Sequence, residues 1–302
     1  MTARPKHLHL YLSGILLLAI AFRAYGVLSH PTALTGDAVD YHRLAIGLVE
    51  GRGYINAEGR PTAWRPPAYP IFLAGVYKIF GVSVVRATMV QAILGGLTVL
   101  MLSALGAMIL GWRRALVAGM IAAVYPAFVW LPRLLLSENL SLFLLLLSLG
   151  AITLYLRTSR MVWMIVFGAL CALNTLVRGA NLFLPIAVAL GILIIQWRSW
   201  KQIVAPLLVM AVAFIVMLLP WTIRNYRVFH HPIPIATQDG LALYSSYWPP
   251  QQNGKRIWGT LPGIEDPAIL AAAQTGDEVL TSRYLNHVTL QRLRENPGFF
   301  FG

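Results

Sequence analysis

The sequence has very little cysteine and few charged side chains. Cys171 is the only cysteine among 302 residues, so the chain can form neither an intrachain disulfide nor a cysteine-ligated zinc site. Charged residues make up 12% of the chain and hydrophobic residues 58%, whereas soluble domains carry roughly 25% charged residues. This composition excludes an ordinary soluble globular protein.

Acidic residues are scarcer than basic ones. The chain has 11 Asp and Glu against 24 Lys and Arg, a net charge of +13. A basic excess can indicate a nucleic-acid partner. Here the basic residues mostly flank apolar runs, as membrane topology and contact with anionic lipids require. The pattern therefore predicts membrane lipids, and not nucleic acid, as the partner of these charges.

Long apolar runs recur along the chain. Each approaches the ~20 residues that a helix needs to cross the hydrocarbon core of a bilayer. The sequence predicts an all-α polytopic membrane protein with about seven transmembrane helices. The predicted spans cover residues 8–28, 86–110, 115–132, 136–156, 161–177, 181–197 and 202–220.

The distribution of basic residues predicts the orientation. With a cytoplasmic N-terminus, the short inner segments carry eight Lys and Arg and the short outer turns carry two, which favours this orientation over its inverse. We expect an integral protein of the plasma (inner) membrane with residues 29–85 and 221–302 outside. The eight inner residues are Arg4, Lys6, Arg113, Arg114, Arg157, Arg160, Arg198 and Lys201, and the two outer ones are Arg133 and Arg178.

The outer loop 29–85 contains two predicted interfacial helices, at residues 37–50 and 68–80. Asp37 and Asp40 are three residues apart, so on a helix they point to the same side. An acid in the first helical turn is also favoured by the helix dipole. Asp37 is therefore either a functional acid or only the start of a helix.

Three further charged residues lie close to the predicted membrane boundary. Arg65 precedes Pro66, which restricts it to an extended conformation, and a rigid arginine beside the lipid surface suits a phosphate. Glu138 opens the fourth span, and Arg178 lies between the fifth and sixth. Ionisable groups near membrane depth are costly and indicate function, although headgroup anchoring or helix capping would also explain them.

The segment after the last span is predicted to begin with interfacial anchors and Arg224, a further phosphate candidate. Residues 230–270 are rich in Pro, Gly and Gln and predict an irregular loop. Residues 277–295 predict an amphipathic helix. His230 and His231 have no matching ligand cluster, so no metal site is expected. We expect residues 1–220 to form a transmembrane core and residues 221–302 an extracytoplasmic segment.

Five segments together resemble glycosyltransferase family 39, the protein O-mannosyltransferase and aminoarabinose transferase superfamily with the GT-C fold. They occur in the same order as in that family and spread over almost the whole chain. Relatives usually have further spans after a segment like 277–301, so we expect a truncated or shorter form. The segments are Gly36-Asp37 to Gly53-Tyr54, Arg65 to Pro70, Pro132 to Glu138, Val177-Arg178 and Pro220-Trp221 to Arg224-Asn225.

The resemblance implies inverting transfer of a sugar from a polyprenyl-monophosphate donor to a hydroxyl of a lipid, glycan or protein acceptor outside the membrane, in cell-envelope glycan synthesis. No cofactor is implied. Asp37 would be the general base, and Glu138 would organise the site. The donor phosphate would be bound by Arg65 and Arg178, with Arg224 as a further candidate. Supporting residues would be Asp40, Tyr41 and Tyr69.

The sequence departs from the family pattern at two positions. Ala38 follows Asp37 where some members carry a second acid, and Trp64 stands where some relatives have an acid. Two alternatives to a glycosyltransferase also remain. A lipid-linked-sugar flippase or transporter would need polar groups near the middle of several spans, and a non-catalytic membrane assembly protein would need no site.

Overall fold

The computed structural model describes residues 6–30, 33–247, 251–252, 255–256, 271 and 275–295. The chain divides into two compact units. Unit 1 comprises Met1–Arg60 and Pro66–Pro220, and unit 2 comprises Pro61–Arg65 and Trp221–Gly302. Each unit has hydrophobic clusters of its own. The expectation that the second part lies outside the membrane stays a prediction.

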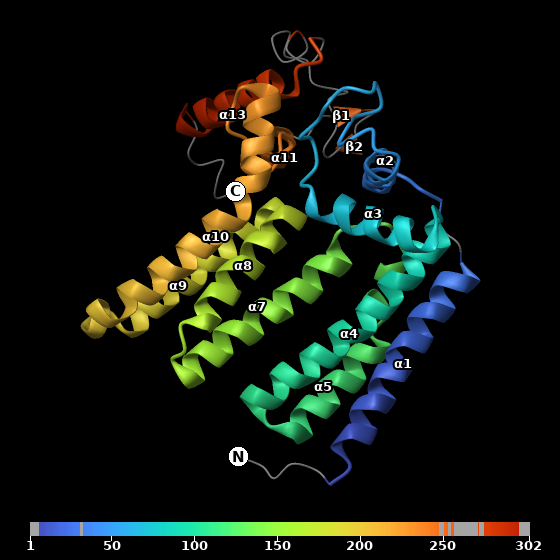
Figure 1. Cartoon of the computed structure of the whole chain (residues 1–302), viewed down its shortest axis with the longest axis vertical. Coiled ribbons are helices and arrows are strands. Elements are labelled where there is room, and N and C mark those ends of the chain that lie inside the picture. Colours follow the sequence, from blue (N-terminus) through green and yellow to red (C-terminus); the bar gives the residue numbers. More distant parts are fainter. Residues whose placement is uncertain are drawn as a thin grey trace. The chain divides into compact units, whose positions relative to one another are not determined.

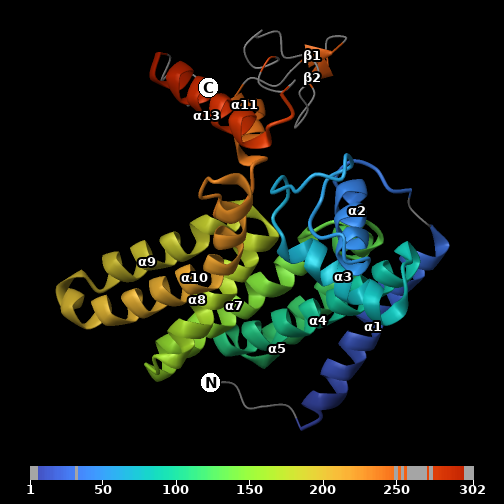
Figure 2. The ribbon, with the colours of Figure 1, turned by 45° about the horizontal axis from the view of Figure 1, so that its top comes forward.

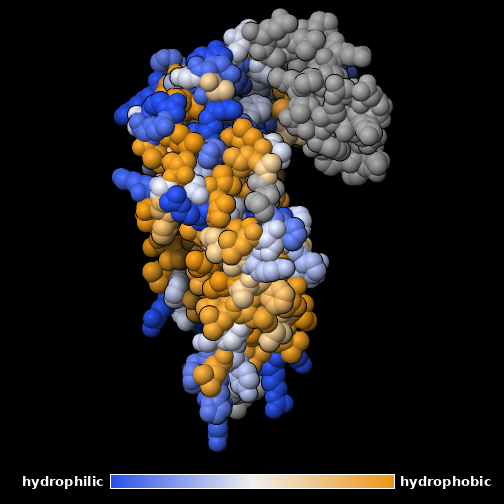
Figure 3. Space-filling model, turned by 90° about the vertical axis from the view of Figure 1, so that its right-hand side faces the viewer, coloured by the Kyte–Doolittle hydropathy of each residue, from blue (hydrophilic) through white to orange (hydrophobic). Residues whose placement is uncertain are grey.

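Within these described residues, four helices are long and apolar enough to cross a membrane (Figure 1). Three are α1 (Leu8–Ser29), α4 (Val84–Leu110) and α7 (Glu138–Thr158), and the fourth is Lys201–Phe229 within α10 (Trp200–Phe229). Large apolar side chains of α1 point outward, with Leu17 68% and Tyr25 70% exposed. Apolar side chains also cover much of the flank seen in Figure 3. Such surfaces suit lipid, so the fold is that of a helical membrane protein.

The remaining predicted spans are broken or short. The third is α5 (Trp112–Val124) followed by α6 (Pro126–Trp130) and the 3₁₀ turn η1 (Leu131–Arg133), bent by 55° at the break. The fifth is α8 (Val162–Val177), and the sixth is the 3₁₀ turn η2 (Gly179–Leu182) with α9 (Phe183–Ile195). A further 3₁₀ turn, η3 (Trp197–Ser199), precedes α10. Among the described residues, four helices, or five with the bent pair, pass as spans, so seven is not confirmed.

A buried arginine joins α1 to the end of α5. Arg23 is 1% exposed and donates to the carbonyl oxygens of Ala19 (2.9 Å), Ala123 (3.0 Å) and Ala122 (3.2 Å). The last carbonyls of a helix have no intrahelical partner, and Pro126, four residues after Ala122, has no N–H to offer. The guanidinium of Arg23 therefore satisfies carbonyls that the proline break leaves open.

The two predicted helices of the first long loop are present as α2 (Asp37–Val49) and α3 (Ala68–Phe80). Gly36 has φ 54°, a left-handed conformation that glycine adopts at little cost, and it directs the chain into α2. Tyr41, Tyr69 and Tyr77 lie in the apolar cluster that joins α2 and α3 to α4, α7 and α8. Both helices are thus packed parts of unit 1. Their position at the bilayer surface stays a prediction.

Unit 2 contains more regular structure than expected. Residues 239–247 form a helix, α11 (Asp239–Tyr247), so the prediction of an irregular loop over 230–270 is wrong there. Short strands β1 (Gln251–Gln252) and β2 (Lys255–Arg256) pair antiparallel, with Gln251 opposite Arg256. Residues 257–270, also in that prediction, lie outside the described part. Helix α13 (Glu278–Glu295) agrees with the predicted amphipathic helix.

The packing of α11 on α13 explains why the loop prediction failed (Figure 2). Leu241 and Tyr244 are buried against Leu285 of α13. A side chain at Gly240 would place its Cβ only 2.4 Å from the carbonyl oxygen of Ser282, so the two helices approach as closely as glycine allows. The glycine that favours a loop in the sequence is here a contact point between helices.

Candidate active site

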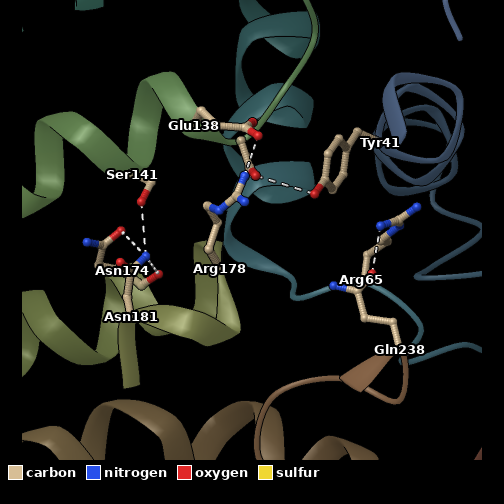
Figure 4. Close-up of polar contacts among 9 residues, drawn as sticks. Tyr41, Arg65, Glu138, Ser141, Asn174, Arg178, Asn181 and Gln238 are labelled. Carbon is tan, nitrogen blue, oxygen red and sulfur yellow. Dashed lines mark hydrogen bonds and ion pairs between the residues drawn. The ribbon is translucent and has the colours of Figure 1, made fainter. Parts of the chain in front are cut away.

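Glu138 and Arg178 form an ion pair in unit 1 (Figure 4). Glu138 is the first residue of α7, and Arg178 follows the last residue of α8 in an extended conformation. The pair is still accessible, because 43% of the Arg178 side chain and 38% of the Glu138 side chain are exposed. A ligand can therefore reach a guanidinium whose charge is already oriented by a carboxylate.

Amide side chains fix the turn that carries Arg178. The Nδ2 of Asn181 donates to the Oγ of Ser141 (3.0 Å), to the Oδ1 of Asn174 (3.1 Å) and to the backbone oxygen of Asn174 (3.2 Å). The N–H of Arg178 donates to the same backbone oxygen (2.9 Å), and that of Asn181 to the oxygen of Arg178 (3.0 Å). Asn174 is fully buried. This network anchors Arg178 between α7 and α8 (Figure 4).

Aromatic side chains and Gln91 support the segment before Glu138. The hydroxyl of Tyr41 donates to the Oγ of Ser137 (3.4 Å), and its ring meets that of Tyr69 edge-on with centroids 4.8 Å apart. The hydroxyl of Tyr69 donates to the Oε1 of Gln91 (2.9 Å), whose Nε2 donates to the oxygen of Leu134 (2.8 Å). Helices α2, α3 and α4 thus meet at the start of α7.

The hydroxyl of Tyr69 stays protonated. Burial raises its pKa well above the usual value, and repulsion from Tyr41, Tyr77 and Glu138 in their ionised forms raises it further. The contribution of Glu138 means that its carboxylate is close enough to Tyr69 for an electrostatic interaction. Tyr69 therefore acts in this site as a hydrogen-bond donor and does not accept a proton.

Asp37 and Asp40 occupy the first turn of α2. Asp37 is exposed and lies one helical turn before Tyr41, so both are on the same side of the helix. Asp40 lies 3.9 Å from the guanidinium of Arg43. The contact between Tyr41 and Ser137 brings this face of α2 to the residue that precedes Glu138. Unit 1 thus brings together four predicted residues, Tyr41, Tyr69, Glu138 and Arg178, and Asp37 lies one helical turn before the first of them.

Arg65 and Arg224 belong to unit 2 and are described within it. The Nη1 of Arg65 donates to the Oε1 of Gln238 (2.6 Å) (Figure 4). Arg224 donates to the oxygen of Thr62 (2.7 Å), and its guanidinium lies 5.1 Å from the ring centre of Trp221. These contacts let Arg224 hold segment 61–65 against the end of α10, a role that the sequence did not suggest.

The sequence interpretation missed the amides that hold the site. Gln91, Asn174 and Asn181 connect its elements, and Gln238 contacts Arg65. A signal for two of them was present, because Gln91 and Asn174 are isolated amides inside apolar runs. A polar group at such a position needs a partner.

The comparisons with known proteins agree with the fold. Residues 64–222 match the family model described as dolichyl-phosphate-mannose-protein mannosyltransferase. Arg65, Tyr69, Glu138 and Arg178 lie inside this range, whereas Asp37, Asp40, Tyr41 and Arg224 lie outside it. No curated protein matches the chain.

A solved structure has a similar fold. It is that of the S. cerevisiae protein O-mannosyltransferase Pmt1-Pmt2 complex bound to the sugar donor, with a TM-score of 0.56 at 19% sequence identity. The match covers 76% of this chain and 34% of the yeast chain, so this chain spans about a third of its relative's length. The predicted resemblance to family 39 and to the GT-C fold is confirmed. The chain belongs to the dolichyl-phosphate-mannose-protein mannosyltransferase family, a family of membrane glycosyltransferases.

Proposed function

We propose that the chain transfers a sugar from a polyprenyl-monophosphate donor to an acceptor hydroxyl, with inversion at the anomeric carbon. The observation that carries the proposal is the accessible pair of Glu138 and Arg178 at the start of α7, next to Ser137, which Tyr41 of α2 contacts. In a chain of this family, a guanidinium held in place and open to a ligand suits the donor phosphate. The acceptor would be a lipid, a glycan or a protein.

The reaction needs one general base and a positively charged side chain at the donor phosphate. The acceptor oxygen forms a bond to the anomeric carbon, and the bond from that carbon to the donor phosphate oxygen breaks. Asp37 takes the hydroxyl proton, and the polyprenyl phosphate leaves with the electron pair. The second pKa of a phosphate monoester is about 6, so the phosphate leaves at neutral pH without a general acid. Arg178 stabilises the charge that develops on it.

Glu138 has a different task from Asp37. Its carboxylate orients the guanidinium of Arg178 and lies where a sugar hydroxyl can contact it. A single base opposite the leaving group gives inversion, whereas retention would require a carboxylate that attacks the sugar. Arg65, held by Gln238 in unit 2, stays a candidate phosphate ligand on the family resemblance alone.

The test is sugar transfer by the reconstituted chain with a panel of polyprenyl-phosphate sugars, measured as release of polyprenyl phosphate. Asp37→Asn should lower turnover by about 10²–10⁴-fold, the usual contribution of a general base, while donor binding is retained. Glu50→Gln, the same change at the other end of α2, should leave turnover unchanged. If Asp37→Asn turns over at the wild-type rate, Asp37 is not the base.

A further inference from the structure

Unit 2 contains a cavity of about 390 Å³ between α13 and the segment that joins α10 to α11. This volume lies within the ~300–1,000 Å³ usual for small-molecule sites. None of the lining residues is acidic, and two carry nitrogen donors. The lining residues are His231, Pro232, Ile233, Pro234, Ala236, Thr237, Val279, Ser282 and Arg283.

Thr237 lines this cavity and carries a buried hydroxyl. The residue is 3% exposed, and its backbone N–H donates to the oxygen of Ala63 (2.9 Å), which fixes its position. Its Oγ1 is buried and has no hydrogen-bond partner within the described part of the chain. A buried polar atom without a partner is costly, so a ligand that accepts from this hydroxyl after the Thr237 side chain rotates toward the cavity would relieve that cost.

Arg283 supplies positive charge to the same cavity. It is an exposed residue of α13, and within the described part of the chain no carboxylate lies within ion-pair distance of it. His231 lines the cavity from the other segment, and Ser282 adds a second hydroxyl. A guanidinium with hydroxyl and imidazole donors and no acidic residue in the lining is complementary to an oxyanion.

We propose that this cavity binds the phosphate or carboxylate group of a sugar-sized ligand. The guanidinium of Arg283 contacts the anion, the Oγ1 of Thr237 rotates toward the cavity and donates to it, and the apolar walls formed by Ile233 and Val279 contact the rest of the ligand. The further assignment of this ligand as an anionic acceptor rests on the proposed function. Binding at the cavity does not, so the two can fail separately.

Binding is measured by calorimetric titration of the full chain, purified in detergent and phosphate-free buffer, with mannose 6-phosphate, glucuronate and uncharged mannose. The first two should bind and mannose should not. Arg283→Gln should weaken binding of the anions by about tenfold or more, as expected for a charge-assisted hydrogen bond. Arg294→Gln, which removes the same charge from α13 away from the cavity, should bind like the wild type.

Thr237→Val separates a ligand contact from a structural role. This nearly isosteric change removes a hydroxyl that has no partner, so the melting temperature should stay the same or rise. Affinity for the anions should fall several-fold. Unchanged affinity in Thr237→Val or Arg283→Gln, or equal binding of mannose, would overturn the proposal. Preference for mannose 6-phosphate over glucuronate would assign a phosphate, and the reverse order a carboxylate.

If the ligand is the acceptor, Arg283→Gln should raise the KM for an anionic acceptor and leave kcat unchanged. Binding without any sugar transfer by the wild type would refute the proposed function and leave the cavity proposal intact. Sugar transfer by the wild type with no anion binding would support the proposed function and refute the cavity proposal.

Discussion

Glu138 and Arg178 contact each other although more than a third of each side chain is exposed. Exposed ion pairs contribute only about 0–1 kcal/mol to stability, because water screens them and holding two long side chains costs entropy. The pair is therefore a poor device for holding the fold together. Its value lies in orienting a charged group that a ligand can still reach, which separates its effect on activity from its effect on stability.

Glu138→Gln should change the melting temperature by no more than about 2–4 °C, the shift that corresponds to about 1 kcal/mol in a chain of roughly this size. Sugar transfer should fall by about 10²-fold, the lower end of the effect of a preorganised charge on a reaction. Thermal unfolding and phosphate release measured on the same preparation would check this. A large loss of stability with normal turnover would mean that the pair is structural.

His42 introduces a dependence on pH between α2 and α3. Its Nδ1 lies 2.7 Å from the hydroxyl of Tyr77, and burial lowers the pKa of the imidazole. The unfolded chain therefore takes up the proton before the folded chain does. The stabilisation is fully present above the ordinary pKa of about 6.5 and is lost as pH falls through the lower folded value.

The melting temperature should accordingly fall between pH 7.5 and pH 5 more steeply in the wild type than in His42→Phe. Phenylalanine keeps the ring against Tyr77 but cannot be protonated. Equal slopes in the two proteins would show that His42 does not contribute to the pH dependence. The measurement is a series of thermal unfolding curves in one detergent at fixed ionic strength.

At the scale of elements, the site depends on how helices end. Helix α7 begins at Glu138 and α8 ends just before Arg178, and the turn between α8 and η2 is closed by Asn181. The end of α8 and the first turns of α7 are thereby linked by hydrogen bonds of a single amide. Because these bonds fix the backbone from which Arg178 extends, Asn181 is a positioning residue for it.

Asn181→Ala removes the two N–H groups that reach three acceptors and should cost about 2 kcal/mol of stability, at about 1 kcal/mol for each N–H. The KM for the donor should rise about tenfold while kcat changes less, because Arg178 loses its fixed position before donor binding. Ser141→Ala, which removes only one of the three acceptors, should show a smaller rise. Equal KM values in all three proteins would show that the turn does not position Arg178.

The elements differ in how far their sequences could predict them. The longest spans follow from apolar run length alone. The third predicted span is broken, and the fifth (α8) and sixth are too short to meet that criterion. Helix α11 was missed because its stability comes from Leu241 and Tyr244 packing on α13, a contact distant in sequence. For the same reason Glu138 and Arg178 could be selected singly as charges at membrane depth, but their pairing could not be predicted.

At the scale of the whole molecule, the family match and the fold match indicate the same class of protein, but this chain is much shorter than its solved relative. The family match covers residues 64–222, and the chain spans about a third of the length of the solved relative. The basic residues of the short segments predict that residues 29–85 and 221–302 lie outside the cytoplasm. That side is where a lipid-linked sugar and an extracytoplasmic acceptor would meet, so orientation is a direct test of the proposed function.

The orientation of the chain in the membrane can be determined by labelling single introduced cysteines, because its only native cysteine, Cys171, is buried. In a Cys171→Ala background, Glu58→Cys should react with a membrane-impermeant maleimide on intact cells. Ser159→Cys should react only after the membrane is opened. Both positions are exposed in the fold, so accessibility reports the side of the membrane. The reverse labelling pattern would place the proposed site in the cytoplasm and contradict the proposed function.

The contact of Arg23 with the end of α5 has a consequence for how the protein is made. The partners of its guanidinium on α5, Ala122 and Ala123, are synthesised about 100 residues after it. A newly made first helix therefore enters the bilayer with an arginine that lacks its later partners, at a cost of at most about 2.5–3.5 kcal/mol, the value for the centre of a span. Arg23 is fully stabilised only after the helix that carries the carbonyls of Ala122 and Ala123 has been synthesised and inserted. Biogenesis of the N-terminal helix is thus coupled to the later insertion of the helix that ends at this proline.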